Sequence, residues 1–173
     1  MINNFATALQ HVLKSEGGFQ ADPRDRGNAN GGMTNLGVTK ATWEEWVGYP
    51  VSEKTMRELT PAQVAPMYRR RYWERINGDA LPAGIDYACF DAAVNSGPGR
   101  AIKWLQGCVG VDVDGSLGPK TLAAVKAFNQ EQLITDYSKR RLSYLTELNT
   151  WPTFGKGWTR RVMEVEQTAL NMI

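Results

Sequence analysis

The sequence has 173 residues, of which 42% are hydrophobic and 22% are charged, and its formal net charge is +2. This length and composition are typical of one globular domain, or of one domain with a small lobe, and no stretch approaches the ~20 apolar residues of a transmembrane helix. The small net charge does not predict nucleic-acid binding, and one histidine with two cysteines makes a poor zinc site, so we expect neither a metal nor a cofactor.

The N-terminal region predicts a helix and then a short hairpin. Apolar residues recur with the spacing of one helical face at Phe5, Leu9, Val12 and Leu13. Gly17-Gly18 is expected to end this helix, because glycine readily adopts the left-handed conformation of a C-cap. The stretch MTNLGVT, residues 33–39, predicts a small β-hairpin, and strand signals are scarce elsewhere.

The rest of the chain predicts helices. Thr60 is expected as an N-cap, with Pro61 at the first helical position and Gln63 completing a capping box. Further helices are predicted over residues 84–97, 99–110, 121–130, 132–148 and 155–173. The N-terminus lacks the basic start and apolar run of a secretory signal, which predicts synthesis in the cytoplasm.

Glu16 is the first candidate for chemistry. It is predicted at the C-terminal end of the first helix, where partial negative charge disfavours an ionised carboxylate. A carboxyl group that keeps its proton can act as a general acid and protonate a leaving oxygen. An exposed glutamate at a frayed helix end fits the same position, so placement alone leaves both interpretations open.

The loop after Glu16 supplies candidates for a second acid. Asp22 and Asp25 lie in a polar stretch, where a carboxylate stays ionised. One protonated and one ionised carboxyl group form the pair that glycoside hydrolysis uses. Thr34 and Thr39 offer hydroxyls that can hold a water molecule or a sugar oxygen. Aspartate and glycine are also common in ordinary loops, so each residue alone is a weak indication.

Taken together, residues 16–39 resemble the signature of glycoside hydrolase family 108, which comprises bacteriophage endolysins and related bacterial muramidases, some of them serving protein secretion. The matching segments are EGGF (16–19), DPRD (22–25) and GGMTNLGVT (31–39). The resemblance implies that Glu16 is the catalytic acid, with Asp25 and Thr34 completing a Glu–Asp–Thr constellation.

The same motif implies substrate contacts from Asp22, Asn35 and Thr39. The linking stretch RGNAN, residues 26–30, is longer than in the family, so Asp22 and Thr39 are alternatives to Asp25 and Thr34. The separation of the two carboxylates would decide between inversion, at ~6.5–9.5 Å, and retention, at ~5–5.5 Å.

Residues 68–106 resemble the second block of that family. The resemblance places Tyr72, Trp73 and Asn95 near the sugar groove, with Asp91 one helical turn before Asn95. Core packing is the alternative for the two aromatic residues. A buried hydrogen bond between helix and loop is the alternative for Asp91 and Asn95.

The stretch VDVDGSLGPKT, residues 111–121, resembles the turn of small peptidoglycan-binding modules. Asp114, Gly115 and Thr121 match that turn and are candidates for cell-wall binding. A tight turn followed by a helix start explains the same residues without a ligand.

The resemblance therefore implies a mainly α, lysozyme-like fold with a small β or loop element. Residues 1–106 would form the catalytic domain and residues 107–173 a helical peptidoglycan-binding lobe. The implied enzyme is an endolysin or muramidase that hydrolyses the β-1,4 bond between N-acetylmuramic acid and N-acetylglucosamine. We expect a monomer that reaches the periplasmic wall through a holin or a secretion system. A wall-peptide hydrolase, a lytic transglycosylase and a non-catalytic peptidoglycan-binding protein remain alternatives.

Overall fold

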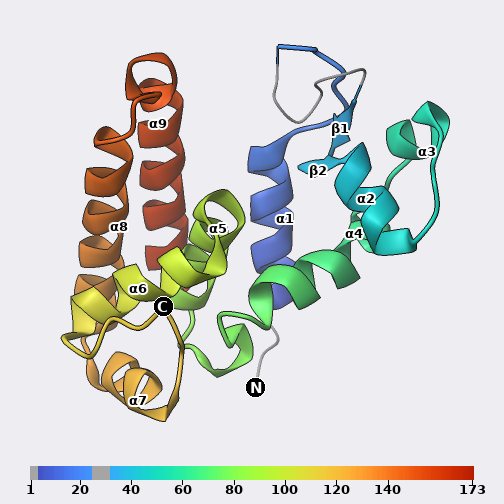
Figure 1. The fold of residues 1–173 in the computed structure, drawn as a ribbon. Helices are drawn as coiled ribbons and strands as arrows, with labels where there is room; N and C mark the ends of the chain where they lie inside the picture. The colour runs from blue at the N-terminus through green and yellow to red at the C-terminus, as the bar shows by residue number, and fades with distance from the viewer. Residues whose placement is uncertain (1–3, 25–31) are drawn as a thin grey trace. The chain divides into compact units, whose positions relative to one another are not determined.

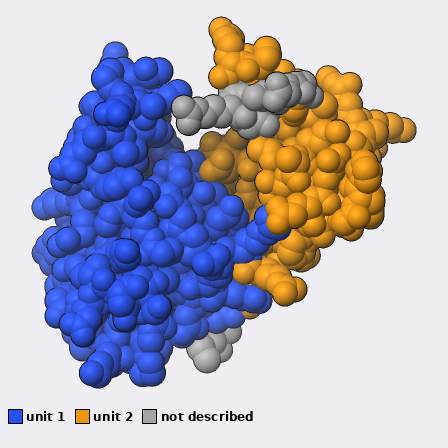
Figure 2. Space-filling view, viewed as in Figure 1, with its two compact units in different colours: residues 1–8, 71–173 blue, residues 9–70 orange. Residues whose placement is uncertain are grey.

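The computed structural model describes residues 4–24 and 32–173, and helices dominate it (Figure 1). The chain divides into two compact units, one of residues 9–70 and the other of residues 1–8 and 71–173 (Figure 2). The mainly α, lysozyme-like fold class is confirmed. The helices are α1 (Phe5–Glu16), α2 (Lys40–Val47), α3 (Glu53–Arg57), α4 (Pro61–Tyr68), α5 (Ile85–Ser96), α6 (Pro98–Val109), α7 (Pro119–Ala127), α8 (Gln130–Thr146) and α9 (Trp151–Leu170).

The unit of residues 9–70 is built on the apolar face of α1. Leu9, Val12 and Leu13 are buried as their spacing predicts. At the start of α4, the capping box between Thr60 and Gln63 is present, with the Gln63 side chain accepting from the Thr60 N–H at 2.8 Å. Sequence patterns therefore located both of these helices.

Apolar periodicity did not predict α2 or α3, because each is short and buries one large side chain. Trp43 is that residue in α2 and Met56 in α3. Both helices begin at a hydroxyl N-cap, Thr39 for α2 and Ser52 for α3, each accepting a hydrogen bond from a backbone N–H of the first turn. These hydroxyl N-caps are the local sequence features that mark the starts of α2 and α3.

The predicted hairpin is present in the same unit. Strand β1 (Thr34–Asn35) pairs antiparallel with β2 (Val38–Thr39), with Thr34 opposite Thr39. Gln20 extends the pairing, because it exchanges two backbone hydrogen bonds of 2.8 Å with Thr34. The loop that follows α1 is therefore fastened to the hairpin.

The second unit is organised around α5, which is buried along almost its whole length. Residues 85–93 are all buried, and α5 packs against α6, α8 and α9. The ring of Phe90 meets those of Phe5 and Trp73 edge-on, with centroids 5.8 and 5.3 Å away. The predicted domain boundary at residues 106/107 lies inside α6 and inside this unit.

Candidate active site

Glu16 is the last residue of α1, and its side chain is half-buried. Gly17 ends the helix in the left-handed region, at φ 81°, and its N–H donates to the Leu13 carbonyl at 3.1 Å. A Cβ placed on Gly37 would lie 2.8 Å from Cγ of Glu16, so the stem of Glu16 lies against the hairpin turn. The end of α1 therefore sets the backbone position of Glu16, and the hairpin turn lies against its side chain.

The hairpin turn is conformationally unusual. Leu36 has φ 51° and Gly37 has φ 74°, the pair of positive values that a type I′ turn requires. Leucine rarely adopts this region, so the turn needs support from its surroundings. Tyr68 provides it, since its hydroxyl donates to the Leu36 carbonyl at 2.7 Å and lies against Gly37.

Sequence reasoning did not identify Tyr68. Its signal is its position one helical turn after Val64 on the predicted helix, which places both residues on one apolar face. Both are buried. Tyr68 therefore reaches the hairpin from α4 and connects two elements that are distant in sequence.

Thr34, Asn35 and Thr39 all lie on the hairpin formed by β1 and β2. Asn35 is buried and donates to the Met56 carbonyl at 2.7 Å, which fastens β1 to the end of α3. Thr39 caps α2, accepting from the Thr42 N–H at 3.1 Å. Thr34 is half-buried, its backbone pairs with both Gln20 and Thr39, and it remains the candidate of the predicted constellation.

The two candidate aspartates differ in what the structure describes. Asp25 lies outside the described residues. Asp22 is paired with Arg24 at 2.7 Å and also accepts from the Arg24 backbone N–H at 2.9 Å. The hydrogen bonds from the Arg24 side chain and backbone lower the pKa of Asp22, which keeps it ionised and weakens it as a base.

Tyr72 and Trp73 close a π-helical turn, Arg69–Trp73. Trp73 is 1% exposed, and its indole N–H donates to Asp79 at 2.8 Å, so the core-packing alternative describes it. Tyr72 is half-buried and keeps its candidacy for substrate contact.

Asp91 and Asn95 share one face of α5 but have different surroundings. Asp91 is 0% exposed and binds Arg141 of α8 at 2.7 Å and Arg161 of α9 at 3.0 Å. Burial opposes its charge, but the attraction of the two guanidinium groups outweighs burial and lowers the pKa of Asp91. Asn95 is exposed and accepts from Arg141 at 3.5 Å. Asp91 therefore makes buried polar bonds, as the alternative interpretation expected, but its partners lie on helices and not on a loop.

Buried Gln106 organises the turn that holds the predicted wall-binding residues. Its Nε2 donates to Asp114 at 2.8 Å and to the Thr121 hydroxyl at 3.1 Å, and its Oε1 accepts from the Gly115 N–H at 2.9 Å. Thr121 is itself buried, and Gly115 has φ 78°. These polar groups hold the turn together, and Gln106 is a residue that sequence reasoning missed. Its signal was a glutamine on the apolar face of a helix just before an Asp-Gly turn.

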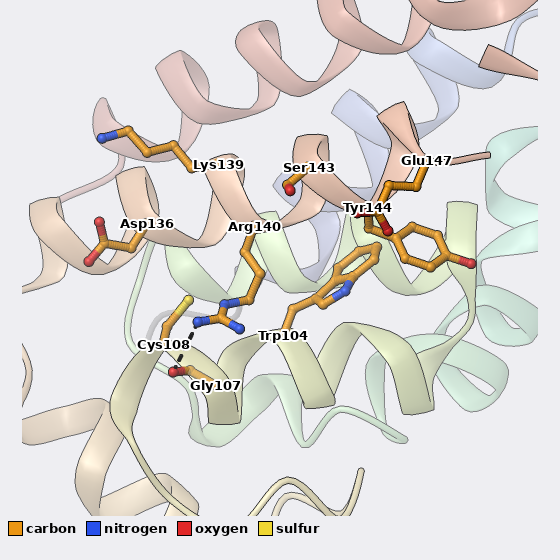
Figure 3. A pocket seen from close by; sticks show the side chains of 9 residues that line it. All are labelled: Trp104, Gly107, Cys108, Asp136, Lys139, Arg140, Ser143, Tyr144 and Glu147. Atoms are coloured by element: carbon orange, nitrogen blue, oxygen red, sulfur yellow. Dashed lines mark hydrogen bonds between the residues drawn. The ribbon is translucent and has the colours of Figure 1, made fainter.

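A shallow groove of about 600 Å³ runs between α6 and α8 (Figure 3). One end is aromatic, where Trp104 and Tyr144 have ring centroids 5.3 Å apart. Trp104 is only 8% exposed, so it offers little ring surface to a ligand. Arg140 reaches across the groove and donates to the Gly107 carbonyl at 3.3 Å. Lys139 and Arg140 are balanced by Asp136 and Glu147, which gives the groove mixed charge.

Within residues 4–24 and 32–173, no group of three His, Cys, Asp or Glu side chains is arranged to hold a metal ion. Over the same ranges, no helix has both the length and the apolar character needed to cross a membrane.

Comparisons with known proteins match two consecutive stretches of the chain to two family models. Residues 9–97 match the model of the family described as glycosyl hydrolase 108, and residues 100–163 match a predicted peptidoglycan domain. The solved structure of SagA from Brucella abortus is similar over 99% of this chain and 97% of its own, with 45% identity and a TM-score of 0.85. No curated protein matches the chain.

Proposed function

Because the chain belongs to the glycosyl hydrolase 108 family, and is therefore a glycosidase that acts on peptidoglycan, we propose that it is an N-acetylmuramidase. The bond it cleaves would be the β-1,4 linkage between N-acetylmuramic acid and N-acetylglucosamine. Such an enzyme is a lysozyme-type hydrolase and would act on the cell wall in the periplasm. That reaction would serve either host lysis by a phage endolysin or passage of a secreted protein through the wall. A holin or a secretion system would be the route by which the enzyme reaches the wall.

The observation that carries this proposal is the position of Glu16. Glu16 is half-buried at the end of α1, and the stem of its side chain lies against the turn at Gly37. A glycosidic oxygen needs a proton as it departs, and a carboxyl group held in place at the end of a helix can deliver one. We therefore assign Glu16 as the general acid.

The second carboxylate would be Asp25, acting with Thr34. An oxocarbenium-like transition state requires an ionised carboxylate, either to activate water or to stabilise the positive charge on the sugar. Asp22 is the weaker candidate, because Arg24 already neutralises it. Thr34 would orient water or a sugar oxygen from the hairpin, and Tyr72 and Asn95 would contact the substrate.

The products distinguish this reaction from the alternatives. We expect mass spectrometry of digested sacculi to find new reducing ends on N-acetylmuramic acid. Reducing N-acetylglucosamine would place the cut at the other glycosidic bond, and 1,6-anhydro ends would indicate a lytic transglycosylase. Released peptides with intact glycan would indicate a peptide hydrolase, and absence of any product would indicate a binding protein.

Replacing Glu16 tests its role. The E16Q variant keeps the shape of the side chain but has no acidic proton, so turnover of sacculi should fall by about 10²–10⁴-fold. Glu53 provides the matched control, since it is an exposed glutamate of the same unit that pairs with Arg57. E53Q should retain full activity, and full activity in E16Q would refute the assignment.

A further inference from the structure

The N-terminal turns of α9 carry a partly exposed cluster of aromatic rings that the proposed reaction does not use. Trp151, Phe154 and Trp158 follow the i, i+3, i+7 spacing of one helical face. Phe154 and Trp158 are stacked at 5.6 Å and 26°, and the rings of Trp151 and Trp158 lie 6.2 Å apart. Phe154 is 51% exposed and both tryptophans are half-buried. We call these three rings the aromatic platform.

Gly155 seats one ring of the platform. A Cβ at this position would lie 2.7 Å from Cε2 of Trp151, so the indole rests directly on the helix backbone. Glycine inside a helix costs about 1 kcal/mol relative to alanine. In α9 the glycine allows Trp151 to lie close to the helix while part of its ring stays exposed. A ring held in this way can serve as a fixed contact surface.

Two cations border the platform. Lys156 and Arg160 are exposed, and with Trp151 they line a surface depression of about 450 Å³. The floor of the depression includes Gly155 and Thr159, whose hydroxyl donates to the Gly155 carbonyl at 2.7 Å. The Thr159 oxygen can still accept a hydrogen bond. The surface thus combines flat aromatic rings, positive charge and a hydroxyl acceptor.

This combination suits the glycan of peptidoglycan. A pyranose ring presents an apolar C–H face that stacks on an aromatic ring, while its edge carries hydroxyl and acetamido groups. The stem peptides attached to the glycan add carboxylates, which complement Lys156 and Arg160. All of these residues lie within 100–163, the segment that matches the peptidoglycan domain.

We propose that the aromatic platform binds the peptidoglycan glycan strand, with a sugar ring stacked on Trp151 and Trp158 and a wall carboxylate near Lys156 and Arg160. The inference rests on the proposed function, since it takes peptidoglycan as the substrate. It moves the wall-contacting surface of this domain away from the turn at Asp114, whose polar groups already bind Gln106, and away from the groove whose Trp104 is covered.

The test measures binding in the E16Q background, so that the ligand is not cut. The probes are purified sacculi, in a sedimentation assay, and soluble peptide-free glycan strands, in calorimetry. W151A and W158A should each weaken binding by roughly tenfold, as for loss of an aromatic anchor. W151F and W158F keep a ring and should retain most of the affinity. K156Q/R160Q should weaken binding to sacculi and reduce its salt dependence, with less effect on peptide-free strands.

Met163 supplies the matched control, because it is 61% exposed on the same helix but outside the platform. M163A should bind as the E16Q parent does. Unchanged binding in W151A and W158A would overturn the proposal. If W151A and W158A lose affinity for phosphatidylglycerol vesicles but not for glycan, the platform binds a membrane. If they instead dissociate a dimer in ultracentrifugation, the platform binds a second copy of the chain. Either result would also overturn the proposal.

The two proposals fail separately. If sacculi digested by the wild-type protein yield no muramic-acid reducing ends, the proposed reaction fails, while platform binding is still measured in E16Q. If those ends appear but the platform variants bind normally, only the platform assignment fails.

Discussion

Glu16 and Asp91 are both carboxylates on helices, but their surroundings differ in kind. Glu16 ends α1, is half-buried, and rests against a strained hairpin turn. Asp91 is completely buried in the middle of α5 and is bound by two arginines. The two arginines compensate the charge of Asp91 within the packed helices, whereas Glu16 is partly accessible at the end of its helix. The difference separates a structural acid from a candidate catalytic one.

Removing Asp91 should have the largest effect on stability. D91A removes the carboxylate that Arg141 and Arg161 bind, and breaking a buried ion pair from one side typically costs about 3–5 kcal/mol of unfolding free energy. Chemical denaturation measures this loss. D112A, at an exposed aspartate of the same unit, should change stability by less than about 0.5 kcal/mol. A similar loss in both variants would remove the distinction between Asp91 and surface acids.

The hairpin turn should respond to substitution at Gly37. G37A combines a positive φ of 74° with close approach to Tyr68 and Glu16, which should cost about 1–3 kcal/mol and lower activity. Gly48 has a similar φ of 86° with nothing within 4 Å of its Cβ position, so G48A isolates the backbone strain. Equal activity in G37A and G48A would show that contact with Glu16 is unimportant.

Replacing Gln106 should cost less unfolding free energy than replacing Asp91, because the Gln106 side chain carries no charge. Q106L removes the partner of the Gly115 N–H and the Thr121 hydroxyl, which should cost about 1–3 kcal/mol. The control Q132L is at an exposed position of α8 and should be near neutral. If Q106L also lowers binding to sacculi by as much as W151A, the turn at Asp114 would regain its place as a wall-binding surface.

Asp86 should give the smallest effect, seen only in the pH dependence of stability. Burial raises the pKa of Asp86, although hydrogen bonds from Asn4 and from the Tyr87 N–H partly oppose this. The folded protein therefore binds a proton before the unfolded chain does as pH falls. Relative to D86N, the wild type should gain stability between neutral pH and about pH 4, with a slope of at most about 1.4 kcal/mol per pH unit. A wild-type curve parallel to that of D86N would contradict this.

Several elements could be predicted from the sequence because their signals are local. The apolar spacing of α1, the capping box at Thr60 and the Leu36-Gly37 hairpin each depend on neighbours within one or two turns of chain. Trp73 shows where local reasoning stops, since a tryptophan suits both a sugar groove and a core. Packing against Phe5 and Phe90, far away in sequence, decided its position.

The sequence by itself determined the helical fold class, the family and the position of Glu16 at a helix end, because these follow from short-range pattern and motif. Only the tertiary structure decided which polar groups are compensated: Asp91 by two arginines, the Asp114 turn by Gln106, and Leu36 by Tyr68. The physical reason is that compensation of a charge or a hydrogen-bonding group depends on partners from other elements. Sequence spacing cannot specify those partners.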